Sequence, residues 1–209
     1  MTISKEQIIT WLEKTAEVMA ENKAYLTELD AAVGDADHGI NMDRGFGKVV
    51  EKLPTVADKD LGTILKTVGM TLMSSVGGAS GPLYGTFFMK AGMGLLKKEE
   101  LASADVVTLM DQGVAGILQR GRANVGDKTM YDLWAPVLEA AKAAAEAGKS
   151  PLELLEESVS IAEKSVEEMK PLQAKKGRAS YLGERSIGHP DPGATSSMLI
   201  LQTLLGVIK

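Results

Sequence analysis

The chain is organised around one stretch, Asp30-Ala31-Ala32-Val33-Gly34-Asp35-Ala36-Asp37-His38-Gly39-Ile40-Asn41, which holds three carboxylates, a histidine and an amide. In a single ideal helix, Asp35 would be rotated well away from the face that Asp30 and Asp37 share. Gly34 and Gly39 argue against such a helix. A helix that ends near Asp30, followed by a turn through Gly34, would instead bring the three carboxylates around one point. We therefore interpret the rest of the chain as the scaffold of this turn.

Carboxylates that converge in this way need a cation. Two of them about 4 Å apart repel by roughly 4 kcal/mol at an effective dielectric constant of about 20. Oxygen ligands favour Mg²⁺ or Ca²⁺, and the spacing does not match an EF-hand loop, so we expect Mg²⁺. Because Mg²⁺ often completes its coordination shell with substrate phosphates, the ligand should be phosphorylated. The alternative is an acidic helix end followed by an ordinary turn.

The composition is that of a globular protein, and we expect one domain over residues 1–209. The chain has 44% hydrophobic and 24% charged residues, and its net charge is -5. Without a basic excess or a long Lys/Arg run, nucleic-acid binding is not expected. The absence of cysteine excludes disulfides, zinc-thiolate sites and thiol nucleophiles. With no signal-like N-terminus and no apolar run of membrane-spanning length, we expect a cytoplasmic protein without a membrane anchor.

Hydrophobic periodicity predicts an all-α fold. Capping-box patterns begin two of the expected helices, at Ser4 and at Ser150. The predicted helices are 5–30, 41–53, 61–76, 82–97, 104–120, 128–147, 151–169 and 194–207. The stretch from Pro171 to Pro192 has no clear period, and we interpret it as a binding loop, with a solvated surface loop as the alternative.

Two further segments carry glycines. Residues 74–82, Ser74-Ser75-Val76-Gly77-Gly78-Ala79-Ser80-Gly81-Pro82, open a predicted helix and would offer backbone N–H groups to an anion. The alternative is a flexible turn between helices with no ligand. Residues 121–129 resemble a P-loop, but Asp127 separates the second glycine from Lys128 and the segment follows a helix. We reject the P-loop interpretation and expect a helix–helix loop.

Together these parts favour phosphoryl transfer. Carboxylates for a metal, backbone donors for phosphate and the Arg178 guanidinium are the groups on which that chemistry depends. Neither histidine lies in a recognisable nucleophile motif, so acyl transfer is not expected. The residues by themselves therefore predict a helical Mg-nucleotide site.

Four motifs in order then resemble a known family, the nucleotide-binding L subunit of dihydroxyacetone kinase. They are Gly34-Asp35-Ala36-Asp37-His38-Gly39 with Asn41, the glycine-rich segment 74–82, residues 176–186 (Lys176-Gly177-Arg178-Ala179-Ser180-Tyr181-Leu182-Gly183-Glu184-Arg185-Ser186), and Asp191-Pro192-Gly193-Ala194. The similarity spans nearly the whole chain. It implies a barrel of eight antiparallel helices with the nucleotide site capping one end.

The resemblance also implies the site residues. Asp30, Asp35 and Asp37 would hold two Mg²⁺ ions that bridge the phosphates of ADP or ATP, the bound coenzyme. The residues implied to bind the nucleotide are His38, Gly39, Ile40, Asn41, Ala79, Ser80, Gly121, Met130, Arg178, Asp191, Pro192 and Gly193.

The function implied is that of the ADP-binding subunit of a phosphotransferase-system-linked kinase. Bound ADP would accept a phosphoryl group from a phosphohistidine carrier protein and pass it to dihydroxyacetone on a substrate-binding subunit, giving dihydroxyacetone phosphate. Neither His38 nor His189 would itself be phosphorylated. A transcription regulator is a further expected partner.

Three alternatives belong to other classes. A related helical domain occurs in fatty-acid kinases, where it is joined to further domains. A nucleotide-sensing module would bind a regulator and transfer nothing. A structural helical protein would bind metal at the acidic turn only adventitiously.

Overall fold

The computed structural model describes all of residues 1–209, and it confirms the expected all-α class. The helices are α1 Lys5–Glu21, α2 Lys23–Val33, α3 His38–Lys52, α4 Leu61–Ser75, α5 Ser80–Gly94, α6 Ser103–Gly121, α7 Met130–Glu146, α8 Pro151–Glu168 and α9 Pro192–Ile208, with 3-10 segments η1 Leu53–Thr55 and η2 Arg178–Ser186. Two short strands, β1 Ile3–Ser4 and β2 Glu100–Leu101, form one antiparallel pair. None of the helices combines the length and the apolar character that a membrane crossing requires.

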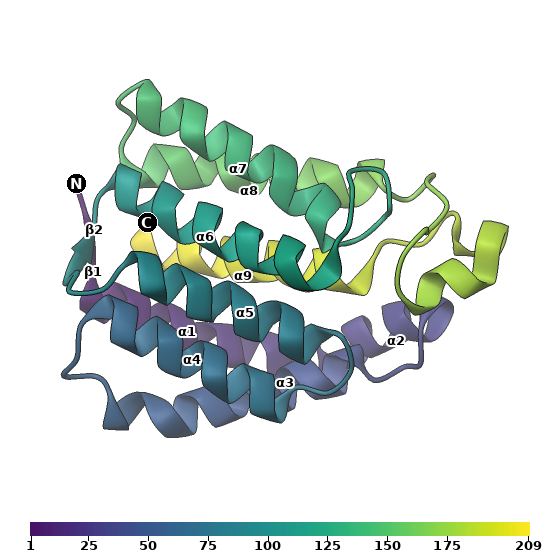
Figure 1. Ribbon diagram of the computed structural model, residues 1–209, viewed down its shortest axis with the longest axis horizontal. Coiled ribbons are helices and arrows are strands. Elements are labelled where there is room, and N and C mark those ends of the chain that lie inside the picture. The colour runs from purple at the N-terminus through teal and green to yellow at the C-terminus, as the bar shows by residue number, and fades with distance from the viewer.

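The helices pack in an order that closes on itself. Successive helices from α3 to α9 lie side by side, and α1 packs against both α3 and α9. Such a ring of contacts is what a barrel of helices requires, while the count of eight antiparallel helices stays a prediction. Both chain ends lie at one end of the molecule, and α2 and the segment before α9 lie at the other (Figure 1).

Several predicted helix boundaries were wrong, and those of the first two predicted helices affect the acidic turn most. The first helix does not continue to Asp30, because Asn22, with φ -94° and ψ 8°, separates α1 from α2. The Asn22 side chain donates to the carbonyl of Val18, which is the local competition with the backbone that makes asparagine a poor helix residue. The helix expected from Asn41 begins instead at His38. The acidic turn is therefore shorter than the sequence suggested.

Local sequence signals explain most of the other helix ends. Ser4 and Ser150 each form the predicted capping box, with Gln7 and Glu153 respectively. The helix predicted from Pro82 begins two residues earlier, at Ser80. The stretch predicted to be irregular contains η2, which Gly183 interrupts at φ 58° and ψ -129°.

The core is aromatic at its centre and aliphatic around it. Phe87 lies between Phe88 and Trp134, with ring centroids 5.3 and 4.9 Å away. Phe88 also contacts Trp11 from α1, at 5.9 Å. Since α1, α5 and α7 all contribute rings to it, this cluster packs these three helices together.

Helices α4 and α5 approach each other closely through paired glycines. A Cβ added at Gly69 would lie 2.5 Å from the backbone nitrogen of Met89 and 2.6 Å from the carbonyl oxygen of Gly85. Gly62 and Gly92 face each other in the same way. Because backbone atoms cannot move aside as a flexible side chain can, these positions exclude any larger residue.

We predict that Gly69→Ala lowers the free energy of unfolding by about 1–3 kcal/mol, because the added methyl group overpacks the α4–α5 contact. The matched control is Gly47→Ala on the exposed face of α3, where an added Cβ has no neighbour within 4 Å. The control should be neutral or stabilising by up to about 1 kcal/mol, from helix propensity. Urea unfolding of the three proteins measures both values, and equal effects at the two sites would contradict the close approach.

Candidate functional site

One cavity opens at the end of the molecule opposite the chain termini, with a volume of about 340 Å³. That volume is in the range of small-ligand sites. The segments around it are far apart in sequence: the end of α2, the acidic turn, the α4–α5 turn, the end of α6, the start of α7, the loop before η2 and the start of α9. The lining residues include Asp30, Asp35, Asp37, His38, Gly77, Gly78, Ala79, Ser80, Gly121, Met130, Lys176, Gly177, Arg178, Asp191, Pro192 and Gly193.

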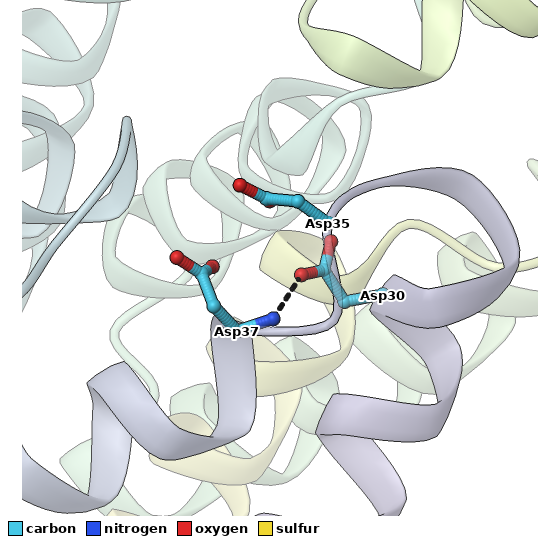
Figure 2. Close-up of side chains that lie close together, drawn as sticks. All are labelled: Asp30, Asp35 and Asp37. Carbon is cyan, nitrogen blue, oxygen red and sulfur yellow. Dashed lines mark hydrogen bonds between the residues drawn. The ribbon is translucent and has the colours of Figure 1, made fainter.

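The acidic turn brings its three carboxylates together, as the sequence predicted. One carboxylate oxygen from each of Asp30, Asp35 and Asp37 lies within 4.8 Å of the others. Figure 2 shows Asp30 reaching from the end of α2 to the backbone nitrogen of Asp37. Its Oδ2 accepts hydrogen bonds from the backbone N–H groups of Asp37, at 2.9 Å, and His38, at 3.1 Å. The Asp30 carboxylate thus holds the turn as well as facing the cavity.

Backbone geometry around the turn is as specific as its side chains. Gly34 is required because a Cβ there would clash with the Asp30 carboxylate. Ala36 has a φ of 60°, a left-handed conformation that costs a non-glycine residue roughly 1–2 kcal/mol. Such an outlier persists only where its surroundings determine it, and outliers of this kind cluster at functional sites.

A guanidinium balances only part of the charge. An Nη atom of Arg178, from η2, lies 2.9 Å from Oδ2 of Asp35. Asp30 and Asp37 have no cationic side-chain partner among the ion pairs of the structure. The three converging carboxylates form an all-oxygen donor set that suits a hard divalent cation, and the one guanidinium leaves most of their negative charge unbalanced. The residues present therefore fit Mg²⁺.

Next to the carboxylates, the glycine-rich turn presents the N-terminus of α5. Gly77, Gly78, Ala79 and Ser80 all line the cavity, and no side chain caps the helix. The N–H groups of its first turn are therefore available to a ligand, and the helix dipole favours an anion there. Gly78 has a φ of 63°, a conformation that glycine adopts without steric cost, so the chain can turn here.

Behind the cavity, His38 begins a chain of buried hydrogen bonds. Its Nδ1 lies 3.0 Å from the Ser80 hydroxyl and its Nε2 lies 2.9 Å from the Ser196 hydroxyl. The Tyr84 hydroxyl then bonds both Ser196, at 2.7 Å, and Ser197, at 2.9 Å. Burial lowers the pKa of His38, although the charges of Asp30 and Asp37 oppose the shift. The serine hydroxyls therefore fix the imidazole at both nitrogens.

At the start of α9, Asp191 is the N-cap residue and accepts a 2.8 Å hydrogen bond from the N–H of Ala194. Burial raises the pKa of Asp191 to about 6, and the charges of Asp132 and Asp30 add to the shift, whereas the Ala194 N–H and Lys128 oppose it. This carboxyl group therefore loses its proton at a higher pH than an ordinary aspartate does.

Three of the residues implied to bind the nucleotide do not line the cavity. Gly39 packs against the α2 backbone at Lys23, and Ile40 is 43% exposed to solvent. Asn41 is buried, and its Oδ1 accepts a 2.6 Å hydrogen bond from Arg44. All three follow His38 on α3. Asn41 lies close to the cavity wall, because a Cβ added at Gly77, a lining residue, would be 2.9 Å from its Oδ1.

Some residues that line the cavity were not predicted. They are Val33, Gly34, Gly77, Gly78, Leu83, Ile117, Ala123, Thr129, Lys176, Gly177 and Ala179. The glycines and Lys176 lie in motifs that the sequence had singled out. Leu83 and Ile117, which lie on helices outside those motifs, carried no signal, because a core position and a cavity wall give the same helical periodicity.

The fold and the site define a class of protein: an all-helical protein with a candidate metal site beside a helix N-terminus that can bind an anion. The DAK2 domain model matches residues 32–206. The chain is 52% identical over 204 residues to the PEP-dependent dihydroxyacetone kinase ADP-binding subunit DhaL of Escherichia coli strain K12, covering 98% of this chain and 97% of that protein. The chain belongs to the DAK2 domain family, within which it groups with these ADP-binding subunits.

Other relatives agree with this placement. The PTS-dependent dihydroxyacetone kinase ADP-binding subunit DhaL of Lactococcus lactis is 44% identical over 200 residues, with 96% of each chain covered. The dihydroxyacetone kinase of C. freundii in its native crystal form is similar in fold, with a TM-score of 0.71 and 26% identity over 96% of this chain. The match covers only 34% of that longer kinase.

We predict that Asp191→Asn changes the pH dependence of stability. Because the folded state raises the pKa of Asp191 from 3.8 to about 6, folding takes up a proton between these values and the parent loses stability as pH rises through 6. Asparagine keeps an N-cap acceptor but does not titrate. The stability of the variant relative to the parent should therefore increase between pH 4 and pH 7, by up to about 3 kcal/mol at 1.4 kcal/mol per pKa unit. Urea unfolding without Mg²⁺ or nucleotide measures it, and parallel pH profiles would contradict it.

Proposed function

We propose that this chain, as one domain over residues 1–209, is the ADP-binding subunit of a phosphoenolpyruvate-dependent dihydroxyacetone kinase. The observation that carries the proposal is the meeting of three carboxylates and an uncapped helix N-terminus in one cavity. The names of the relatives at 40–52% identity support the nucleotide and the acceptor. Bound ADP is the phosphoryl relay, and dihydroxyacetone phosphate is the product.

The reaction has two balanced transfers. In the first, the P–N bond of a phosphohistidine on a carrier protein breaks and a P–O bond to the β-phosphate of ADP forms, giving ATP. In the second, the terminal phosphoryl group passes to a hydroxyl oxygen of dihydroxyacetone held by a partner subunit, and the hydroxyl proton is released. ADP is regenerated, so the nucleotide remains bound between turnovers.

Asp30, Asp35 and Asp37 are the residues that would hold Mg²⁺, and we propose two ions. Bound there, Mg²⁺ supplies positive charge that offsets the phosphate charges. The two backbone N–H groups that donate to Asp30 fix its orientation toward the cavity. Arg178, which pairs with Asp35 across the cavity, adds a guanidinium within reach of the phosphates.

Other segments would hold the rest of the nucleotide. The N–H groups at Ala79 and Ser80 bind phosphate oxygens at the start of α5. Gly121 and Met130, together with the turn from Asp191 to Gly193, enclose the nucleoside; these residues line the same cavity. Gly39, Ile40 and Asn41 belong to the same proposed set of nucleotide-binding residues, although they do not line the cavity.

We further propose that neither His38 nor His189 carries phosphate. Both ring nitrogens of His38 lie within hydrogen-bonding distance of serine hydroxyls, so neither has a lone pair free for attack without breaking a buried bond. His38 instead orients the Ser80 hydroxyl at the phosphate end of the cavity.

The proposed partners follow from the two transfers. One is a dihydroxyacetone-binding kinase subunit, and the other is a phosphohistidine-carrying phosphotransferase subunit. A transcription regulator is a third, and cytoplasm is the proposed location. Each kinase partner must reach the cavity, which is open at one end of the helices.

The test is to purify the protein in Mg²⁺ under non-denaturing conditions, denature it and identify the released nucleotide. We expect about one ADP per chain in the parent and little in Asp35→Ala, since the variant lacks one of the three carboxylates that would hold Mg²⁺. The control is Asp58→Ala, whose exposed carboxylate pairs only with Lys59.

Addition of the carrier protein, phosphoenolpyruvate and the substrate-binding subunit should then convert dihydroxyacetone to its phosphate. Absence of nucleotide in the parent, together with no thermal stabilisation by added ADP and Mg²⁺, would refute the proposal. Acid-labile phosphate recovered on a histidine of this chain would refute the relay through ADP.

A further inference from the structure

Lys128 is a buried cation that pairs with no carboxylate. Its residue is 3% exposed, and its Nζ donates to three backbone carbonyls: Lys170 at 3.0 Å, Leu172 at 2.8 Å and Ser186 at 2.7 Å. An ammonium has three N–H donors, so each one is used. Burial lowers the pKa of Lys128, and the charge of Asp191 opposes that shift.

The three carbonyls belong to the two ends of one segment. Residues 170–188 leave α8, pass the cavity at Lys176, Gly177 and Arg178, and return toward α9. Three other hydrogen bonds help to hold this segment: the N–H of Lys175 donates to the Asp127 carbonyl, that of Gly188 donates to the Lys170 carbonyl, and that of Ala174 donates to the Ser186 hydroxyl at 2.9 Å. Lys128 therefore closes the base of the loop that carries Arg178 to Asp35.

The backbone around Lys128 forms a rigid turn. Lys128 has a φ of 61°, an unfavourable conformation for a residue with a Cβ. The Asp127 carboxylate accepts from the N–H of Asn124 at 2.8 Å, and the Asp132 carboxylate accepts from the N–H of Thr129 at 2.8 Å. The backbone before α7 is thus fixed on both sides of Lys128, which gives the ammonium a defined position.

We propose that Lys128 is a positioning residue for the nucleotide site: its ammonium fixes residues 170–188 and so holds Lys176, Gly177 and Arg178 against the cavity. This inference rests on the function proposed above. Lys128 does not itself line the cavity, so its effect on a ligand must pass through the loop. A side chain of equal length without donors would leave three carbonyls unpaired and release the loop.

The test uses the absence of cysteine from the chain. A Lys128→Cys variant carries a single thiol, which can be alkylated in urea before refolding. With 2-bromoethylamine the product has the length of lysine and its ammonium group. With 1-bromopropane the product has the same length but no N–H donor. The two products have the same length and differ only in the terminal group, an ammonium with its charge and three N–H donors or a methyl group, so they separate the effect of the ammonium from that of packing.

Two quantities are measured on the parent and both products: hydrogen exchange of residues 170–188, and the affinity for ADP in Mg²⁺ by calorimetry. In the propyl product we expect exchange in the loop to rise and ADP affinity to fall, each by about tenfold. In the aminoethyl product both should return to within about twofold of the parent. Exchange in residues 61–94 should be the same in all three, and Lys164→Met on the surface of α8 should match the parent.

Equal loop exchange and equal ADP affinity in the two products would overturn the inference and leave the proposed function intact. If the parent itself does not bind ADP, the proposed function fails, and the exchange comparison still decides whether Lys128 fixes the loop. If the propyl product does not refold, NMR spectra of the unmodified protein with ¹⁵N-labelled lysine test the three hydrogen bonds of Lys128 directly. A lysine ammonium protected from exchange at neutral pH supports the three bonds, and its absence overturns them.

Discussion

Mutual repulsion among Asp30, Asp35 and Asp37 is the constraint on which the rest of the site depends. Their oxygens lie within 4.8 Å of one another, where each pair repels by roughly 3–4 kcal/mol at an effective dielectric constant of about 20. Hydrogen bonds from the backbone of the turn offset part of this cost at Asp30, and Arg178 offsets part at Asp35. The remaining negative charge favours a divalent cation at this point, and a cation so placed would attract phosphate.

The helical scaffold converts this local turn into a cavity. Because the helices are long and return at each connection, every second connection comes to the same end of the molecule (Figure 1). The acidic turn, the α4–α5 turn, the α6–α7 connection and the segment before α9 therefore meet, although they span residues 34 to 191. The paired glycines of α4 and α5 fix where the N-terminus of α5 stands relative to its neighbours.

The parts of the site that depend on short-range sequence could be predicted, and the parts that depend on long-range contacts could not. Gly34, followed closely by two aspartates, indicates a turn through local sequence alone, and Ser4 and Ser150 mark helix starts correctly. Asn41 is assigned to the ligand by family resemblance, and in the structure it does not line the cavity and its Oδ1 accepts a hydrogen bond from Arg44. Nothing local distinguishes those two possibilities.

Lys128 is a second residue whose role depends on long-range contacts and could not be predicted from local sequence. In the sequence, Lys128 was notable only as the lysine of a segment that resembles a P-loop. Its three acceptors lie 42 to 58 positions away, so its local sequence does not reveal them. Its charge could have bound phosphate directly, yet burial behind the loop leaves backbone carbonyls as its partners. The phosphate-binding cation of a P-loop acts at the ligand, whereas this one acts on the segment that brings another cation, Arg178, to the ligand. A glycine-lysine pattern alone cannot tell these roles apart, since the chain that follows α8 decides which carbonyls the ammonium meets.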